Sequence, residues 1–124
     1  MTPDEVALYA LSMPEATEHE PGPGMCLYKV GGKIFAVLTP ATGARPDQVT
    51  LKCEPGLAPH LRAQHAAVRP GLYGHRQHWN TVVLDGTVSD GELADMIDHS
   101  WERVVARLSR ATREQLLRLR AGLP

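Results

Sequence analysis

The chain has 124 residues, of which 43% are hydrophobic and 22% are charged, and its formal net charge is −1. This length supports one domain with a hydrophobic core and is too short for two, and the near-neutral charge excludes a protein that binds polyanions over its whole surface. No apolar run approaches the ~20 residues that cross a bilayer, and the acidic start is unlike a secretory signal. We therefore expect a cytoplasmic protein that does not enter a membrane.

The charged residues fall in separate blocks. Residues 1–20 contain five acidic residues and no Lys or Arg, whereas residues 100–124 contain six Arg and two Glu. The stretch between Glu54 and Asp85 contains no acidic residue, yet it carries three Arg and four His. Affinity for nucleic acid depends on the local neutralisation of phosphates, so these basic stretches leave weak, salt-dependent binding open.

The first residues are typical of a helix start. Thr2 is the expected N-cap, Pro3 occupies the first helical position, and Glu5 completes a capping box. The helix that follows ends before Pro14, with one face formed by Val6, Tyr9, Ala10 and Met13. Residues 15–24 are acidic and rich in Pro and Gly, so we expect a connector without regular structure, in which His19 is solvated.

Two apolar segments flank Gly31-Gly32, which is a strong signal for a two-residue hairpin turn. The expected strands are residues 25–30 and 33–38. Pairing Val30 with Lys33 places Tyr28 opposite Phe35 and Cys26 opposite Val37.

The middle of the chain alternates between loop and short regular segments. Residues 39–48 have the composition of a loop, and residues 49–52 alternate as a short third strand. Residues 55–65 predict a short helix that turns Leu57 and Leu61 inward. Because proline breaks an interior turn, the regular helix is expected to begin only at Pro59.

The stretch from Val68 to Asp85 combines turn formers, basic groups and aromatic residues. Arg69-Pro70-Gly71 is typical of a turn, and residues 66–78 are expected to form an exposed loop. This loop leads Trp79 into a strand over residues 80–84. Binding residues concentrate on loops held by a rigid scaffold, so this loop is the first candidate for a functional surface.

The clearest amphipathic helix is predicted from about Asp90 to Leu108, after a capping box that begins at Ser89. Its apolar stripe is expected to pack on the sheet and to bury Met96, Ile97, Trp101, Val104 and Val105. His99 falls among the charged residues of the opposite face, where we expect it to be solvated.

The remaining predictions concern the C-terminal end and the two cysteines. Residues 112–120 predict a last short helix capped by Thr112, with Leu116, Leu117 and Leu119 as its apolar residues. Cys26 and Cys53 are expected to stay free thiols, because a reducing compartment disfavours a disulfide bond.

Four stretches together resemble the MmcQ/YjbR family: GGKIFAVL (31–38), VTLKC (49–53), VRPGLYGHRQHWNTVVLDG (68–86) and ELADMIDHSWERVVARL (92–108). The resemblance implies an α+β fold, a two-layer sandwich in which an antiparallel sheet is backed by helices, as in the CyaY (frataxin-like) group. It covers residues 3–108, so we expect a domain over residues 1–108. Residues 109–124 are then a basic helical extension of the same domain.

Members of this family are usually described as DNA-binding, which implies a nucleic-acid site in this chain. The polar positions that match the family pattern are Lys33, Lys52, Arg69, His78 and Trp79, and Arg76 keeps the charge of a family lysine. Two departures occur, at Gly22-Pro23, where the family has an aromatic residue and glycine, and at His75-Arg76, where it has asparagine and lysine.

Three functions from different classes remain open. The first is non-enzymatic, weak and nonspecific binding of double-stranded DNA by a monomer or weak dimer, with Lys33, Lys52, Arg69 and Arg76 on phosphates and His78 or Trp79 on sugar or base. In the alternative structural interpretation, Trp79 anchors the core and the arginine stems cover apolar surface.

The second function is a small anionic-ligand site or an enzyme that uses the same basic residues, with His78 as acid or base and Lys52 or Arg76 binding the anion. The third is metal handling by the acidic residues near the first helix, by analogy with frataxin-like folds. No spacing in the chain is typical of a metal or cofactor site, and we expect neither.

Overall fold

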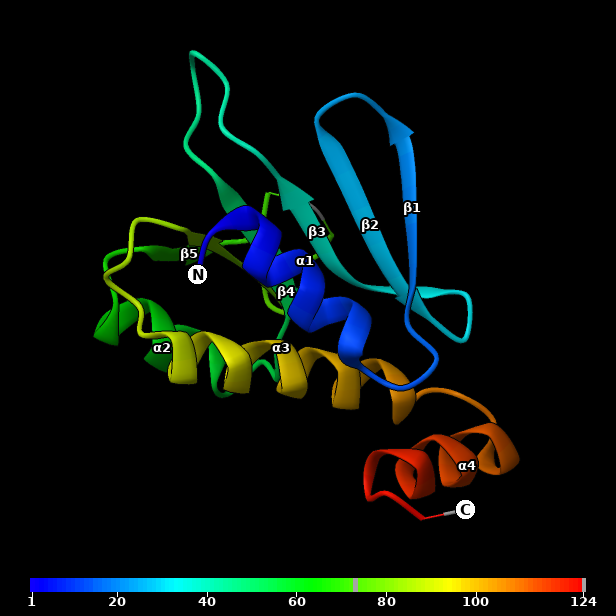
Figure 1. Cartoon of the computed structure of the whole chain (residues 1–124). Helices are drawn as coiled ribbons and strands as arrows, with labels where there is room; N and C mark the ends of the chain where they lie inside the picture. The colour runs from blue at the N-terminus through cyan, green and yellow to red at the C-terminus, as the bar shows by residue number, and fades with distance from the viewer. Residues whose placement is uncertain (73, 124) are drawn as a thin grey trace.

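The computed structural model describes residues 1–72 and 74–123. In this part of the chain, one six-stranded antiparallel sheet has the order β1-β2-β3-β4-β6-β5, and helices back it (Figure 1). The expected α+β fold, with an antiparallel sheet backed by helices, is therefore confirmed. None of the described helices is long and apolar enough to cross a membrane.

The elements follow one another along the chain with short connections. Their bounds are α1 (Pro3–Ser12), β1 (Thr17–Gly22), β2 (Met25–Val30), β3 (Lys33–Thr39), β4 (Gln48–Lys52), α2 (Ala58–Gln64), β5 (Val68–Pro70), β6 (Trp79–Val83), α3 (Asp90–Val105) and α4 (Arg110–Arg120).

The start of α1 follows the local chemistry of the sequence. The side chain of Thr2 accepts a hydrogen bond from the backbone N–H of Glu5, and the Glu5 carboxylate accepts one from Thr2. Two contacts attach α1 to α3: Tyr9 Oη donates to Asp98 over 2.7 Å, and the N-terminal ammonium lies 2.7 Å from Asp90. The two helices therefore lie side by side (Figure 1).

The expectation of an irregular connector at residues 15–24 was wrong, because Thr17–Gly22 form the edge strand β1. Its side chains are almost all exposed, so the strand shows no apolar alternation that a sequence pattern would reveal. Backbone pairing with β2 holds it in place, and Tyr28 Oη donates to Glu18 over 2.6 Å. Pro21 is tolerated because an edge strand leaves one row of backbone groups unpaired.

The hairpin at Gly31-Gly32 forms as predicted, but its register was only partly right. Both glycines have positive φ, +58° and +77°, and Val30 pairs with Lys33. Beyond Lys29 the register shifts, so Tyr28 faces Ala36, not Phe35. A β-bulge that adds one residue to β3 explains the shift, since turn chemistry sets the register only next to the turn.

Residues 66–78 are not one loop, because Val68–Pro70 pair with β6 as the second edge strand, β5. The turn expected at Arg69-Pro70-Gly71 therefore begins only after Pro70. Tyr73, within the expected loop, lies outside the described residues. As predicted, α2 begins close to Pro59, and Leu57 and Leu61 both face α3, although Leu57 is not buried, since 37% of it is exposed.

The core lies between α3 and the sheet, with α1 closing one side. Trp101 and Ile97 on α3 are completely buried, and Met96 is half-buried. Ser89 caps this helix as expected, by accepting a hydrogen bond from the backbone N–H of Glu92. The other half of the expected capping box does not form, because the Glu92 carboxylate pairs with His65.

The last helix, α4, begins earlier than predicted, because Ser109 and not Thr112 is its N-cap. Leu116 is buried, whereas Leu117 and Leu119 are 46% and 40% exposed. The Arg120 guanidinium lies over the Trp101 ring at 5.4 Å and attaches α4 to α3.

Candidate functional site

Four cationic side chains, Lys33, Lys52, Arg103 and Arg107, lie near one another and are called the basic cluster below. Partial burial lowers the pKa of the Lys52 ammonium, and the other three charges lower it further. Lys33 begins β3, Lys52 ends β4, Arg103 lies in the last turn of α3, and Arg107 follows two residues after the end of that helix. A helix C-terminus carries partial negative charge, which favours cations at this position.

A single buried serine positions α3 against the ends of β3 and β4. Ser100 Oγ donates to the carbonyl oxygen of Phe35 on β3 and accepts from the backbone N–H of Lys52 over 2.8 Å. Arg103 follows Ser100 by about one helical turn. The contact between strand and helix therefore places Arg103 beside Lys52.

The basic cluster has no carboxylate neutralising it directly. Within residues 1–72 and 74–123, none of its four side chains forms an ion pair, and Nε of Arg103 is buried without a hydrogen-bond partner. Glu54 lies within the field of Arg103, but its carboxylate accepts from the backbone N–H groups of Gly56 and Leu57 over 2.8 and 2.9 Å. The cluster therefore presents a net positive charge.

Trp79 lies beside this cluster but is held mainly by packing. Its ring centroid is 6.0 Å from Nζ of Lys52, its partner across β4 and β6. The loop after β5 closes over the indole: a Cβ at Gly74 would lie 2.5 Å from the ring, and one at Gly71 would lie 2.7 Å from Cβ of Trp79. Trp79 is therefore a half-buried packing partner of Lys52 and of the loop, and it does not belong to the main core cluster in which the alternative interpretation placed it.

Arg62 on α2 supports the same loop from the other side. Its Nε donates to Asn80 over 2.7 Å, and its terminal nitrogen donates to the backbone carbonyls of Arg76 and Trp79. In the sequence, Arg62 counted only as one charge of an acid-free stretch. In the structure its guanidinium hydrogen-bonds to other groups of the protein.

The other predicted site residues lie at separate places. Arg76 is exposed in the loop, and half-buried His78 stacks edge-on against His75 at 5.3 Å. Arg69 on β5 pairs with Thr81 and is one of the charges that lower the pKa of Asp85, after the hydrogen bonds from Thr87. Of the predicted site residues, Lys33 and Trp79 both lie near Lys52. Arg69 lies on the edge strand β5, opposite Thr81 in the middle of β6.

His99 was wrongly expected to be solvated. It is half-buried, and its Nε2 accepts a hydrogen bond from the backbone N–H of Glu54 over 3.1 Å. Burial lowers its pKa from the ordinary value of 6.5, and the nearby Arg103 charge lowers it further. His99 is therefore a neutral hydrogen-bonded group at neutral pH.

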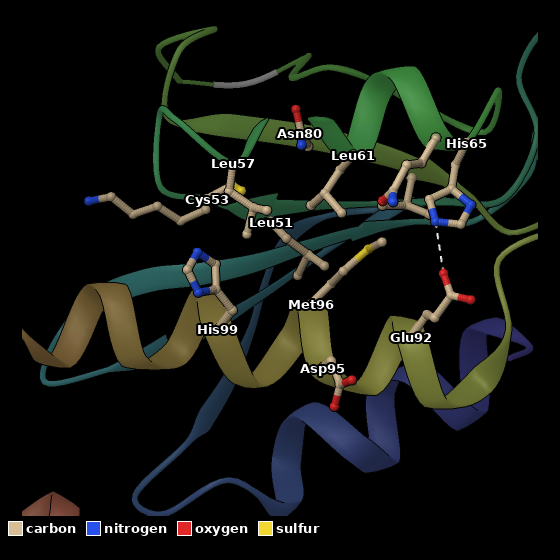
Figure 2. A pocket seen from close by; sticks show the side chains of 13 residues that line it. Leu51, Cys53, Leu57, Leu61, His65, Asn80, Glu92, Asp95, Met96 and His99 are labelled. Carbon is tan, nitrogen blue, oxygen red and sulfur yellow. Dashed lines mark ion pairs between the residues drawn. The ribbon is translucent and has the colours of Figure 1, made fainter. Parts of the chain in front are cut away.

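A cleft of about 750 Å³ opens between α2 and α3 (Figure 2). Its floor comes from the sheet and includes Leu51 and Val82, while Leu57 and Leu61 come from the α2 side and Met96 from α3. His65 and Glu92 meet at one end, with 2.8 Å between Nε2 and Oε2, and His99 lines the other. This size and apolar lining are typical of small-molecule sites.

Acidic residues near α1 do not gather into a ligand set for a metal. Within the described residues, no group of three His, Cys, Asp or Glu side chains is arranged to hold a metal ion. The acidic residues of β1, Glu18 and Glu20, are exposed on an edge strand, and the Glu18 carboxylate accepts a hydrogen bond from Tyr28.

Comparison with known proteins identifies the family of the chain. The model of the YjbR family matches residues 11–103. The chain is 34% identical over 121 residues to the protein YjbR of Escherichia coli strain K12, which covers 96% of this chain and 100% of the relative. The chain belongs to the YjbR family.

Other relatives agree with this family assignment. The protein YbdF of Escherichia coli O157:H7 is 27% identical over 77% of the chain and 76% of its own length. A crystal structure of the Deinococcus radiodurans protein DR2400, a DUF419 domain, superposes with a TM-score of 0.83 at 28% identity. That match covers 99% of this chain and 89% of the other. A Pseudomonas syringae protein at 23% identity and TM-score 0.70, over 81% of this chain and 96% of its own, shares the fold.

In this YjbR-family chain, sequence reasoning missed the contribution of Arg103 and Arg107. They were assigned to a basic C-terminal block, whereas the fold turns them toward Lys52. A sequence signal did exist, because both follow Met96 and His99 at intervals of three or four residues on the same side of a helix.

Proposed function

We propose that this protein binds double-stranded DNA weakly and with little sequence preference, without catalysing a reaction. The observation that supports this proposal is the basic cluster, in which Lys33, Lys52, Arg103 and Arg107 from three elements face no ion-pairing carboxylate among the described residues. Phosphate contacts of this kind carry affinity but read no base sequence.

The loop residues have supporting roles in this proposal. Arg76 is exposed in the loop three residues before Trp79 and would extend the phosphate contacts beyond the cluster, together with half-buried His78. Arg69 lies along β5 and would contact DNA only if the duplex also follows that edge. Trp79 is half-buried under the loop, so it positions Lys52 and is not available for full stacking on a base.

The number of contacts predicts a measurable salt dependence. Each neutralised phosphate releases about 0.9 ions from B-DNA, so a cluster of this size gives a log-log salt slope of about −3 to −4. Fluorescence anisotropy with labelled duplexes of two unrelated sequences, at about 50 and 150 mM salt, measures the slope and the sequence preference together.

Charge variants locate the contact surface. Lys33→Gln combined with Arg107→Gln removes two exposed cluster charges and should flatten the slope by about two units. Arg110→Gln combined with Arg113→Gln removes the same charge from α4 and should leave the slope unchanged. A third pair, Arg69→Gln with Arg76→Gln, measures the contribution of the loop and of β5.

The results with these variants can contradict the proposal in two ways. If the α4 pair reduces affinity and the cluster pair does not, DNA contacts the C-terminal extension and the proposed surface is wrong. If intact protein at micromolar concentration does not bind either duplex at about 50 mM salt, the DNA-binding proposal fails as a whole.

The alternative of an enzyme or a small-anion site at His78 has less support. The ring of His78 packs against His75, and within the described residues neither ring is hydrogen-bonded to a carboxylate that would orient a general base. The cleft of Figure 2 does not include His78 or Arg76. The cleft therefore offers a better enclosed place for a small molecule than the loop does.

A further inference from the structure

We infer that the cleft between α2 and α3 binds a small amphiphilic carboxylate, with its apolar body between the helices and its carboxylate at the end lined by His99 and Lys52. This site goes beyond the proposed DNA binding and has its own ligand.

Contacts at both ends of the cleft fix the distance between α2 and α3. At one end, His65 after α2 meets Glu92 in the first turn of α3 over 2.8 Å. At the other, the backbone N–H of Glu54 donates to His99 over 3.1 Å. Figure 2 shows His65 and Glu92 at one end and His99 at the other, with the apolar side chains between them. Each end of the cleft is therefore closed by a specific contact between the two sides.

The middle of the cleft is apolar and partly open to water. Leu57, which is 37% exposed, and Leu61 line it opposite Met96, and Leu51 forms part of its floor. A ligand that covers these side chains gains about 25 cal/mol for each Å² of apolar surface removed from water. Methionine adapts to ligands of different shape, because its side chain is flexible.

Charge changes sign along α3, and this sets the orientation of a ligand. Glu92 and Asp95 line the cleft near the N-terminal end of the helix, whereas Arg103 and Arg107 follow His99 at the C-terminal end. Lys52 lines the cleft and belongs to the basic cluster. A carboxylate is therefore attracted to the His99 end and repelled from the Glu92 end.

Hydrogen-bond donors at the His99 end match this head group. Because Nε2 of His99 accepts the hydrogen bond from Glu54, the proton of the neutral ring is on Nδ1, where it can be donated. Lys52 adds a full charge, and a charge-assisted contact to a carboxylate is stronger than one between neutral groups.

The length of the cleft limits the size of the ligand. From Glu92 to His99 the helix rises about 10 Å at 1.5 Å for each residue. A medium-chain acid such as octanoate fits this span, and a volume of about 750 Å³ leaves room for a branched or aromatic body. Octanoate is therefore a suitable probe.

The test is a titration of the intact isotopically labelled protein with octanoate, followed by backbone amide NMR shifts. We expect saturable shifts at Leu57, Met96 and His99. Octylamine, with the opposite charge on the same chain, should bind at least about tenfold more weakly, and Lys52→Gln should weaken octanoate about tenfold, as expected for loss of one charge-assisted contact.

A filling variant tests the position of the apolar body. Leu57→Trp places a larger side chain at the rim of the cleft and should abolish saturable binding. Leu119→Trp is the matched control, because Leu119 is exposed to a similar extent, 40% against 37%, and does not line the cleft. Should Leu57→Trp fail to fold, octanoate binding to Met96→Trp provides the same test from the α3 side.

The inference would be overturned by an absence of saturable shifts, by shifts centred on exposed Leu117 and Leu119 of α4, or by equal binding of octanoate and octylamine. Octanoate binding that Leu57→Trp leaves unchanged would also overturn it. DNA anisotropy of the same variant separates the two proposals, because Leu57→Trp keeps every charge of the basic cluster. If octanoate binds and DNA does not, only the DNA-binding proposal fails.

Discussion

The backbone N–H of Glu54 donates a hydrogen bond over 3.1 Å to Nε2 of His99, which lies on α3. This contact requires an unprotonated Nε2, since a protonated imidazole would place one N–H group against another. It joins the segment before α2 to α3 and closes one end of the cleft. Protonation of His99 would therefore break the contact that holds the segment before α2 against α3.

We predict that stability falls on acidification because of His99. Its folded pKa lies below the ordinary value of 6.5, so below about pH 6.5 the unfolded state binds more protons than the folded state. The contribution is present above pH 6.5 and is lost as pH falls through the folded pKa. Urea unfolding at about pH 7.5, 6.5 and 5.5 should show a smaller loss in His99→Gln than in the parent chain.

The control for this measurement is His19→Gln, in the exposed strand β1. It removes one exposed imidazole without touching the cleft, and the pH dependence of its stability should follow that of the parent chain. An equal loss of stability in the parent and in His99→Gln would show that His99 does not titrate as described.

We predict that Gly74→Ala is more destabilising than Gly86→Ala. Both glycines have positive φ, +73° and +83°, so each substitution costs about 1 to 2 kcal/mol in backbone strain. Only at Gly74 would the new Cβ collide, at 2.5 Å from the Trp79 ring, whereas nothing lies within 4 Å at Gly86. We expect a total of about 2 to 4 kcal/mol for Gly74→Ala from chemical denaturation. Equal effects would mean that the loop moves freely away from Trp79.

Local chemistry was enough to predict several element boundaries. Thr2 and Ser89 cap α1 and α3 because their hydroxyls accept from backbone N–H groups three residues later, and that contact needs no tertiary partner. Gly31-Gly32 supplies the two positive φ angles of the hairpin turn. Features set within four residues of the chain were therefore accessible from the sequence.

Features that depend on distant partners were not accessible. β1 exists because the backbone of β2 pairs with it, and an exposed edge strand needs no apolar pattern. His99 appeared solvated because helical periodicity says nothing about α2 and Glu54, which cover it. Arg103 joins Lys52 only through the packing of Ser100 between two strands, 48 residues from Lys52 along the chain.

We predict that Trp101→Ala costs about 3 to 5 kcal/mol of unfolding free energy. Trp101 is completely buried, its Nε1 donates to the carbonyl of Pro14 over 3.3 Å, and Arg120 covers its ring. Leu117→Ala, at a position that is 46% exposed, should change stability by less than about 0.5 kcal/mol. A denaturation midpoint of Trp101→Ala equal to that of the parent would refute the described packing of α3.

We predict that both cysteines are free and that Cys26 reacts before Cys53. Neither thiol forms a disulfide bond among the described residues, and Cys26 is half-buried whereas Cys53 is buried. Burial raises the pKa of both thiols, which lowers the fraction of reactive thiolate. Alkylation without reductant should add two groups to unfolded protein, and one group first, at Cys26, to folded protein. Absence of any added group after unfolding would reveal a disulfide bond.

We predict that Ser100→Ala costs about 1 to 3 kcal/mol, although it removes only one oxygen atom. Ser100 is completely buried, and its Oγ is the hydrogen-bond acceptor for the backbone N–H of Lys52 at 2.8 Å. Without it, the Lys52 N–H and the Phe35 carbonyl each lose a partner, and burial prevents water from replacing it. Ser12→Ala is the matched control, since Ser12 is exposed on α1 and its hydroxyl donates only to Tyr9 of the same helix. Its cost in urea unfolding should stay below about 0.5 kcal/mol. If the two alanine variants lose equal stability, Ser100 does not hold α3 against β3 and β4, and the proximity of Arg103 to Lys52 needs another cause.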